Sequence, residues 1–368
     1  MPALARATLA LAGVPAPTEL LRLPASAGAA ALQLLVVPGN PGLASFYGVL
    51  LRRLHAAFGG AADVEAVSHL GHDGAGLAGD GAAFCLDAQI EHKVALLRQH
   101  VLAPGRPPAV VLGHSIGAFM MLEAIRRAEA QGADPARLPK VVLLMPFLAT
   151  DWGSRRQRLL RWLSAHAPRL AAAAGAVGAA PAWAQRALLA LTQPGVEAHA
   201  ADSIRQLMAR GVVHNAFHLA AHEFRDLDRP VDWEPLRRLG ARAAVVCAPR
   251  DMWLPDHHVE QLRSELPDTE VHAHDRLSHA FCMEERQCEA VAALVRHTVL
   301  AALPQLAAVG APLAAGAAPA GGDVARASDQ ASCADLQVLL DERRPVAKLA
   351  GDAASVAPAA LVPSAAGA

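Results

Sequence analysis

A short apolar run at residues 109–112 leads directly into Gly113-His114-Ser115-Ile116-Gly117. Residues 118–130 follow with the pattern of an amphipathic helix, because apolar and charged side chains fall on opposite sides of it. A buried strand, a Gly-x-Ser-x-Gly turn and a helix in this order are typical of a nucleophile elbow. In such an elbow the turn exposes the serine, and the helix directs its N-terminal N–H groups at the same point. The segment therefore predicts Ser115 as a nucleophile, with an ordinary structural serine as the alternative.

The two glycines have a steric role in this interpretation. Side chains two residues before and two residues after the serine would collide with the neighbouring strand and helix in so sharp a bend. We therefore assign Gly113, His114 and Gly117 to the elbow around Ser115.

Strand-like and helix-like segments alternate on both sides of this turn. Short apolar runs predict buried parallel strands, and the amphipathic stretches between them predict helices. The expected strands are 32–37, 64–68, 109–112, 141–145, 243–248 and 270–274, preceded by a hairpin of 7–11 and 19–23, and the expected helices are 46–58, 86–102, 118–130 and 285–303. This order predicts an α/β-hydrolase fold, with a mostly parallel central sheet, helices on both faces and a helical cap insertion.

The chain divides into four segments in this interpretation. Residues 1–150 and 231–303 supply the N-terminal and C-terminal parts of the α/β core. Residues 151–230, where the strand–helix alternation stops and helical patterns take over, form the cap or lid, a candidate lipid-interface segment. Residues 304–368 are rich in alanine, proline and glycine, which predicts a low-complexity, disordered tail with one short helix at 334–344.

Composition excludes some classes of function. Lysine plus arginine (33) nearly balance aspartate plus glutamate (34), so no basic excess points to a nucleic-acid partner. The five cysteines are scattered without the paired spacing of a metal site, which suits a reducing compartment. The apolar stretch at 23–51 is broken by Pro-Gly-Asn-Pro-Gly, and residues 298–322 are only weakly hydrophobic, so we expect no transmembrane helix.

A Pro-Gly-Asn-Pro-Gly turn at residues 38–42 follows the first parallel strand. A turn at the carboxyl end of a strand is where an α/β hydrolase places the second N–H donor of its oxyanion hole. Pro41 has no N–H, so Asn40 is the predicted donor, together with the N–H of Ile116 just after the serine. A simple strand-to-helix turn is the alternative.

An acid and a histidine follow the serine in the order that this fold requires of a catalytic triad. Asp251 lies just past the strand at 243–248 and is the predicted orienting carboxylate; a turn aspartate or a helix N-cap is the alternative. His279 lies in the loop after the last strand and is the predicted base. His272 and His274 compete with it, but both lie within the strand and would lack the reach.

The cap combines aromatic, apolar and basic residues. It contains three of the five tryptophans and a cluster of arginines: Trp152, Trp162 and Trp183, with Arg155, Arg156, Arg158 and Arg161. This composition is typical of helices that lie in a membrane or lipid-monolayer interface. A helical cap that packs its apolar side on the core is the alternative.

Three histidines of the cap recur every four residues: His214, His218 and His222. They would stack on one helix face, but they drift apart along the helix axis, and neither a His-Glu-x-x-His pattern nor a nearby cysteine accompanies them. We therefore predict no metal, and we predict no cofactor.

Four segments together resemble the lipid droplet-associated hydrolase family: residues 38–42 with Phe46-Tyr47, residues 113–119, residues 251–255 and residues 278–281. The similarity extends over residues 7–303. The resemblance implies a serine hydrolase at the cytosolic face of lipid droplets and the endoplasmic reticulum, linked to turnover of cholesteryl (sterol) esters or triacylglycerol, with an apolar cap segment as anchor. It also implies Ser115 as nucleophile, Asp251 as orienting acid and His279 as base. The cap departs most from the family, because residues 170–184 are rich in alanine and glycine.

The expected reaction is ester hydrolysis through an acyl-enzyme. His279 takes the proton of Ser115 as the serine attacks an ester carbonyl, and water then releases the acyl group. The same triad would serve another serine esterase, a thioesterase or a monoacylglycerol lipase. A mainly non-catalytic protein that organises the lipid-droplet surface is the alternative from a different class. The expected partners are a neutral lipid ester and, through the cap, a lipid droplet or membrane surface.

Overall fold

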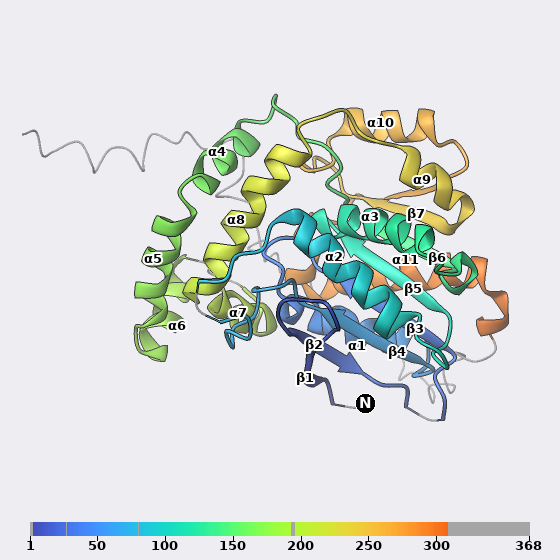
Figure 1. Ribbon diagram of the computed structural model, residues 1–368, viewed down its shortest axis with the longest axis horizontal. Helices are drawn as coiled ribbons and strands as arrows, with labels where there is room; N and C mark the ends of the chain where they lie inside the picture. The colour runs from blue at the N-terminus through green and yellow to red at the C-terminus, as the bar shows by residue number, and fades with distance from the viewer. Residues whose placement is uncertain (1–2, 27, 80, 193–195, 308–368) are drawn as a thin grey trace, which may run out of the picture.

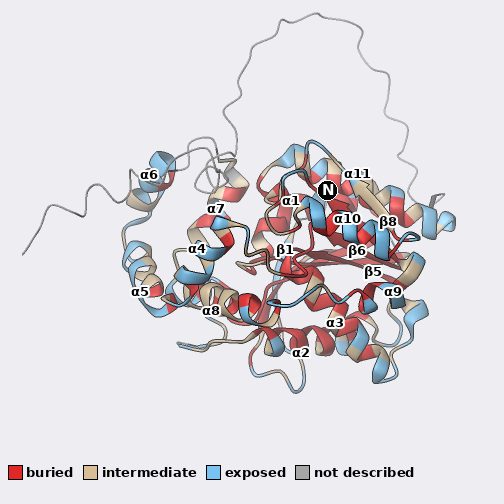
Figure 2. Ribbon diagram, turned by 90° about the horizontal axis from the view of Figure 1, so that it is seen from above, coloured by how far each residue is buried: buried red, intermediate tan, exposed pale blue. Residues whose placement is uncertain are grey.

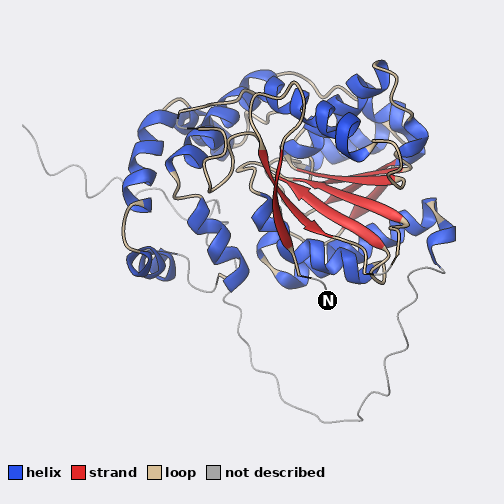
Figure 3. Ribbon diagram, turned by 60° about the horizontal axis from the view of Figure 1, so that its bottom comes forward, coloured by secondary structure: helices blue, strands red, loops and turns tan. Residues whose placement is uncertain are grey.

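An eight-stranded sheet runs through the part of the chain that the structure, a computed structural model, describes: residues 3–26, 28–79, 81–192 and 196–307. In sheet order the strands are β1 (Ala5–Leu9), β2 (Thr18–Leu23), β4 (Ala62–Val67), β3 (Leu32–Val37), β5 (Ala109–His114), β6 (Lys140–Leu144), β7 (Ala243–Cys247) and β8 (Glu270–Ala273). β2 pairs antiparallel with β1 and β4, and the other pairs are parallel (Figure 3). The predicted mostly parallel sheet and the predicted N-terminal hairpin are both confirmed.

Helices cover both faces of this sheet (Figure 1). α1 (Gly48–Ala57) and α11 (Glu285–Ala302) pack on one face, while α2 (Leu86–Leu96), α3 (Ile116–Ala130), α9 (Glu234–Leu239) and α10 (Asp256–Glu265) pack on the other. Successive side chains of a strand point to opposite faces, so Leu34 and Val36 join the first core cluster and Leu35 and Val37 join the second. Burial on both faces explains why these strands are continuously apolar.

Short 3₁₀-helical and π-helical turns connect these elements. They are η1 (Ala44–Tyr47), the π-helical turn η2 (Leu97–Val101), η3 (Pro135–Arg137), η4 (Gly240–Arg242), η5 (Phe281–Met283) and η6 (Pro304–Ala307). The helix expected over 46–58 therefore begins with a 3₁₀ turn, and the one expected over 86–102 divides into α2 and η2. Leu97 and Val101 remain fully buried, so the wider turn keeps the apolar face inward.

The segment between β6 and α9 forms helices that gather on one side of the sheet (Figure 1). They are α4 (Arg155–Ser164), α5 (Ala167–Gly178), α6 (Ala182–Thr192), α7 (Ala198–Gln206) and α8 (Arg210–Asp226). Figure 2 shows that α4, α5 and α6 are much more exposed than the strands. The helical insertion is confirmed, whereas the boundaries at residues 151, 230 and 303 stay a prediction.

Residues 308–368, which include most of the predicted tail and its helix at 334–344, lie outside the described residues. Within the described ranges, no helix combines the length and the apolar character needed to cross a bilayer.

Glu65 of β4 is fully buried among basic side chains. One of its carboxylate oxygens is 2.7 Å from His100 Nε2 and 3.1 Å from Gln33 Nε2, and the other is 3.2 Å from Arg22 Nε and 3.5 Å from Arg106 Nη2. Burial by itself would raise the pKa of Glu65. The hydrogen bond from His100 and the electrostatic effect of His100, Arg106 and Arg22 outweigh burial and hold this pKa below its usual value.

We expect Glu65→Gln to lower the free energy of unfolding by about 2 kcal/mol at pH 7, because the neighbouring cations lose a buried counter-charge. A lowered folded-state pKa means that this stabilisation is present above the unfolded-state pKa of about 4.3 and is lost as the pH falls through the lowered value. Urea unfolding of both proteins at pH 7 and in acid measures the effect. A difference between the two proteins that did not shrink in acid would contradict the assignment.

Candidate active site

Ser115 lies at the junction of β5 and α3, in a backbone conformation that residues other than glycine rarely adopt. β5 ends at His114, α3 begins at Ile116, and Ser115 between them has φ 53° and ψ −124°. Its N–H donates to the carbonyl of Leu144 in β6, and its own carbonyl accepts from the N–H of Ala118. A positive φ at a non-glycine residue is strained, and such strain concentrates at functional sites.

The backbone leaves no room for a side chain at three glycines around Ser115. A Cβ atom at Gly117 would lie 2.2 Å from the carbonyl oxygen of Pro38, and one at Gly113 would lie 2.6 Å from the Cα of Ala118. A Cβ atom at Gly39 would lie 2.8 Å from the Cβ of Ser115. The strand β3 and the turn after it can approach the serine only because these positions are glycine.

A chain of hydrogen bonds connects Ser115, His279 and Asp251. His279 Nε2 is 3.0 Å from Ser115 Oγ, and His279 Nδ1 is 2.8 Å from Asp251 Oδ2. An ionised carboxylate only accepts hydrogen bonds, so the Nδ1–H of His279 donates to Asp251, and Nε2 accepts the hydroxyl of Ser115. The structure thus brings together three predicted site residues from distant parts of the chain. This arrangement allows a base to remove a serine proton while a carboxylate orients the base.

Asp251 lies in the loop after β7, and its side chain is fully buried. Its second oxygen, Oδ1, accepts the N–H of Trp253 at 2.9 Å. The alternative role as an N-cap does not apply, because the N-cap of α10 is Pro255. Both oxygens of Asp251 therefore have a fixed partner, which restricts the rotation of the carboxylate.

The two competing histidines have other partners. His272 Nε2 lies 2.7 Å from Glu270 Oε1 and 3.2 Å from Thr298 Oγ1. His274 accepts a local backbone N–H with its Nδ1. In the part of the chain that the structure describes, neither ring forms a hydrogen bond with Ser115.

His114, next to the serine, is held by the single tyrosine of the chain. The hydroxyl of Tyr47 accepts the N–H of Gly39 at 3.0 Å and donates to His114 Nδ1 at 2.6 Å. The ring centroid of His114 is 4.9 Å from that of His279. Burial and the neighbouring His279 lower the pKa of His114 well below its usual value, so the ring is neutral at pH 7. It therefore packs against His279 without adding a positive charge.

The Pro38–Gly42 turn lies beside Ser115 and contains a cis peptide bond between Asn40 and Pro41. Among the described residues, the backbone N–H groups of Asn40 and Ile116 donate to no other group. His72 holds the turn from the core side, with Nδ1 2.6 Å from the carbonyl oxygen of Pro41. Burial lowers the pKa of His72 to about 4, so a neutral ring donates through Nδ1–H at pH 7. Both N–H groups are available as donors, and their role as an oxyanion hole stays a prediction.

Two residues that the sequence analysis did not assign to the site contact it. Tyr47 holds the turn and His114, and Glu223 of α8 accepts a hydrogen bond from the Asn40 side chain at 3.0 Å. One feature of the sequence could have indicated Glu223. It lies four residues after Leu219, at a position that the helical spacing of apolar residues places on the buried face of α8. No comparable pattern marks the hydroxyl of Tyr47.

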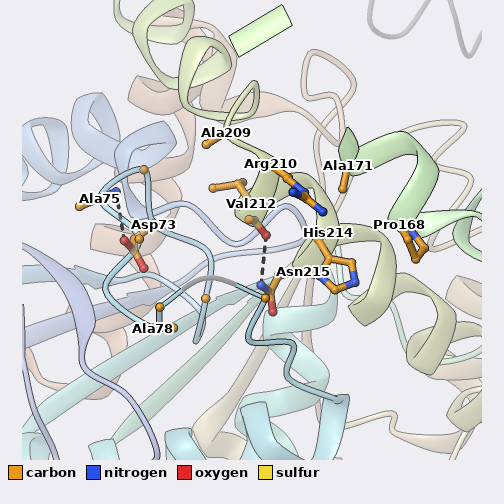
Figure 4. Close-up of a pocket in the computed structure, with 16 residues that line it drawn as sticks. Asp73, Ala75, Ala78, Pro168, Ala171, Ala209, Arg210, Val212, His214 and Asn215 are labelled. Atoms are coloured by element: carbon orange, nitrogen blue, oxygen red, sulfur yellow. Dashed lines mark hydrogen bonds between the residues drawn. The ribbon is translucent and has the colours of Figure 1, made fainter. Parts of the chain in front are cut away.

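A cavity of about 720 Å³ lies between the loop after β4 and the cap (Figure 4). Its lining includes Asp73 and small residues of that loop, Ala171 of α5, and Arg210 and Asn215 of α8. Asn215 attaches the loop to α8, because its amide donates to the carbonyl of Ala82 at 2.8 Å. Ser115, Asp251 and His279 are not among the residues that line this cavity.

The three histidines of α8 stack along the helix. The ring centroids of His214 and His218 are 6.2 Å apart, and those of His218 and His222 are 4.8 Å apart. Within the described ranges, no group of three or more histidine, cysteine, aspartate or glutamate side chains is arranged to hold a metal ion. The absence of a metal and of a cofactor stays a prediction.

Comparison with known protein families decides the membership of this chain. A family model described as lipid-droplet associated hydrolase matches residues 30–282. The chain belongs to this family. Relatives include the lipid droplet-associated hydrolase of Gallus gallus, 23% identical over 268 residues, with 69% of this chain and 80% of the relative covered. The protein of that name from Pongo abelii is 24% identical over 275 residues, with 70% of this chain and 81% of the relative covered.

Solved structures confirm the α/β-hydrolase fold of this family member. The haloalkane dehalogenase DbeA from Bradyrhizobium elkani USDA94 superposes with a TM-score of 0.54 at 11% identity, covering 81% of this chain and 100% of that chain. A thermophilic esterase from Thermogutta terrifontis superposes with a TM-score of 0.51 at 16% identity, covering 80% of this chain and 99% of that chain. A dehalogenase and an esterase share this fold, so the fold alone does not identify the reaction.

We expect Gly117→Ala to lower the free energy of unfolding by about 3 kcal/mol or more, because the new methyl group would collide with the carbonyl oxygens of Val37 and Pro38. Gly211→Ala in α8 is the matched control. A Cβ atom there meets nothing within 4 Å, and alanine favours the helix, so this variant should keep or slightly increase stability. Urea unfolding followed by tryptophan fluorescence gives both values. Equal midpoints for Gly117→Ala and wild type would show that the elbow has room for a side chain.

Proposed function

We propose that this protein is a serine hydrolase that cleaves carboxylic esters of neutral lipids, either a cholesteryl (sterol) ester or triacylglycerol. The observation that carries the proposal is the hydrogen-bonded chain from Ser115 through His279 to the buried Asp251. Membership of the lipid-droplet associated hydrolase family supports hydrolytic chemistry. The names of the relatives support a lipid droplet as the place of action. The proposed location is the cytosolic face of lipid droplets and of the endoplasmic reticulum.

The proposed reaction has two halves. Ser115 Oγ attacks the ester carbonyl while its proton passes to His279 Nε2, and Asp251 stabilises the imidazolium that forms. The N–H groups of Ile116 and Asn40 donate to the oxyanion of the tetrahedral intermediate. The alcohol leaves with the proton from His279, and water, activated by the same ring, then hydrolyses the acyl-enzyme. Side chains and backbone groups of this chain perform each step of the proposed reaction, so we expect no cofactor and no metal.

A neutral lipid ester has to be reached at a lipid surface, because it is insoluble in water. Large apolar side chains stand exposed on three cap helices, namely Leu159 and Trp162 on α4, Val177 on α5, and Trp183, Leu188 and Leu191 on α6. Exposed apolar groups beside arginines favour binding in the interface of a monolayer. We therefore propose α4 to α6 as the lipid-facing part of the cap.

Trp152 does not belong to this exposed set. The guanidinium of Arg161 lies 4.7 Å from the centroid of its ring, and its indole N–H donates to Asp228 at 2.6 Å. Of the three cap tryptophans, Trp162 and Trp183 are the ones that face outward.

We expect Ser115→Ala to lose labelling by a fluorophosphonate probe and to lower kcat on a soluble p-nitrophenyl ester by at least about a thousandfold, because the nucleophile is gone. Ser264→Ala is the matched control, since this serine is exposed on α10 and its hydroxyl donates only to a local carbonyl. Its labelling and turnover should equal those of wild type. Undiminished turnover by Ser115→Ala would refute the mechanism.

A substrate panel of cholesteryl oleate, triolein, monoolein and palmitoyl-CoA separates the competing activities. Preference for monoolein would indicate a monoacylglycerol lipase, and preference for palmitoyl-CoA a thioesterase. If the Ser115→Ala protein still changed droplet size in cells as much as the wild-type protein does, this would favour a protein that mainly organises the droplet surface.

The double variant Trp183→Ser, Leu191→Ser should weaken binding to triolein droplets coated with phosphatidylcholine by at least about tenfold, because two large apolar groups leave the interface. These side chains are 72% and 82% exposed, so we expect the fold and the turnover of a soluble ester to remain unchanged. Ala187→Ser, an exposed position on the same helix, is the control. Flotation measures binding. Wild-type flotation of the double variant would exclude α6 from the lipid contact.

A further inference from the structure

The side chain of Asn40 connects the Pro38–Gly42 turn, which carries one predicted oxyanion donor, to the cap helix α8. Its Nδ2 donates to the carbonyl oxygen of Ala216 at 2.8 Å and to Glu223 Oε1 at 3.0 Å. The two acceptors lie seven residues, about two helical turns, apart on α8, so they share one face of the helix. A side-chain amide has two N–H donors, and α8 therefore accepts both of those of Asn40.

Glu223 is a carboxyl group in an apolar environment. It is 3% exposed, and its helix neighbours Leu219 and Phe224 pack into the same buried cluster as Ile116, the residue of the other predicted oxyanion donor. Burial raises the pKa of Glu223 to about 8, and the hydrogen bond from Asn40 offsets this effect only in part. At neutral pH the carboxyl group is mostly protonated, and its carbonyl oxygen accepts from Asn40.

The other contacts of the turn come from the core. His72 holds the carbonyl of Pro41, and Tyr47 holds the N–H of Gly39. Asn40 lies between Gly39 and Pro41, and its side chain forms its hydrogen bonds with α8. The hydrogen bonds of its side chain restrict the rotation of the peptide units on both sides of its Cα, including the N–H that is the predicted oxyanion donor. Displacements of the order of 1 Å at such a donor are costly for catalysis.

We propose that Glu223 is a positioning residue for the oxyanion hole. By holding the side chain of Asn40, it keeps the Asn40 N–H directed at the oxyanion, so the site is complete only when α8 is docked on the turn. The kinetic part of this inference rests on the proposed function. α4 and α5, which carry exposed apolar side chains, pack against α8. A lipid contact of the cap is therefore linked to the active site through the Glu223–Asn40 hydrogen bond.

The kinetic test compares Glu223→Leu with Glu223→Gln. Leucine has a similar size but no acceptor, so kcat on a soluble ester should fall by about tenfold or more while KM changes by less than about twofold. Glutamine keeps an oxygen that can accept from Asn40, and it should restore kcat to near the wild-type value. Urea unfolding of each variant identifies any loss that comes from misfolding. Equal losses of kcat in the two variants, or a change in KM alone, would overturn the positioning role.

A spectroscopic test does not depend on turnover. The chain has two asparagines, Asn40 and Asn215, so selective ¹⁵N-asparagine labelling of the full-length protein gives two backbone amide signals and one pair of side-chain NH₂ signals for each residue. The Asn40 signals should shift in Glu223→Leu and stay close to wild type in Glu223→Gln. Asn215, whose amide donates to Ala82 and Gly211, is the internal reference.

The two tests separate the two proposals. Unchanged Asn40 signals in Glu223→Leu would overturn the role of Glu223, whatever the kinetics. Absence of turnover that depends on Ser115 in the wild type would refute the proposed function, and the amide signals would still decide whether Glu223 holds the turn.

Discussion

Ser115 has a positive φ because β5 must turn into α3 within one residue, and hydrogen bonds to β6 and to the first turn of α3 hold it there. Such a bend tolerates no Cβ atom at Gly113 or Gly117, and it brings Gly39 against the serine itself. The close approach of β3 and its turn to the elbow follows from these contacts. Asp251 and His279, from later loops, complete the arrangement only because the parallel strands end at the same edge of the sheet.

The turn at residues 38–42 is held from two sides that differ in kind. On the core side, neutral buried groups, the His72 ring and the Tyr47 hydroxyl, donate to or accept from the backbone of the turn. On the cap side, α8 holds the Asn40 side chain through Ala216 and Glu223. The core contacts form within the sheet and its adjoining loops, whereas the α8 contact depends on how an inserted helix docks. The geometry of the turn is therefore set jointly by the core and by the cap.

The elements of the core follow from local patterns. Continuous apolar runs produce strands because both faces of the sheet are covered, and the spacing of apolar residues in α2, α3 and α11 matches the helical period. The candidate site residues Ser115, Asp251 and His279 could also be named from the order of turns along the chain, since each lies just past a strand. Local patterns do not indicate which buried polar groups support them. Tyr47 and Glu223 gain their partners only through contacts across the fold.

The sequence by itself determined the strand and helix order, the elbow with its two glycines, and the three side chains of the candidate triad, because these depend on residue type and on local spacing. The tertiary structure alone decided which cap side chains face outward. Trp152, in the turn before α4, packs against Arg161, while Trp183 of α6 stands exposed, although both lie in the same tryptophan- and arginine-containing cap. It also decided the partner of Glu223. The helical spacing of apolar residues places this acid on the buried face of α8, but only the docking of α8 on the Asn40 turn gives it a hydrogen-bond donor.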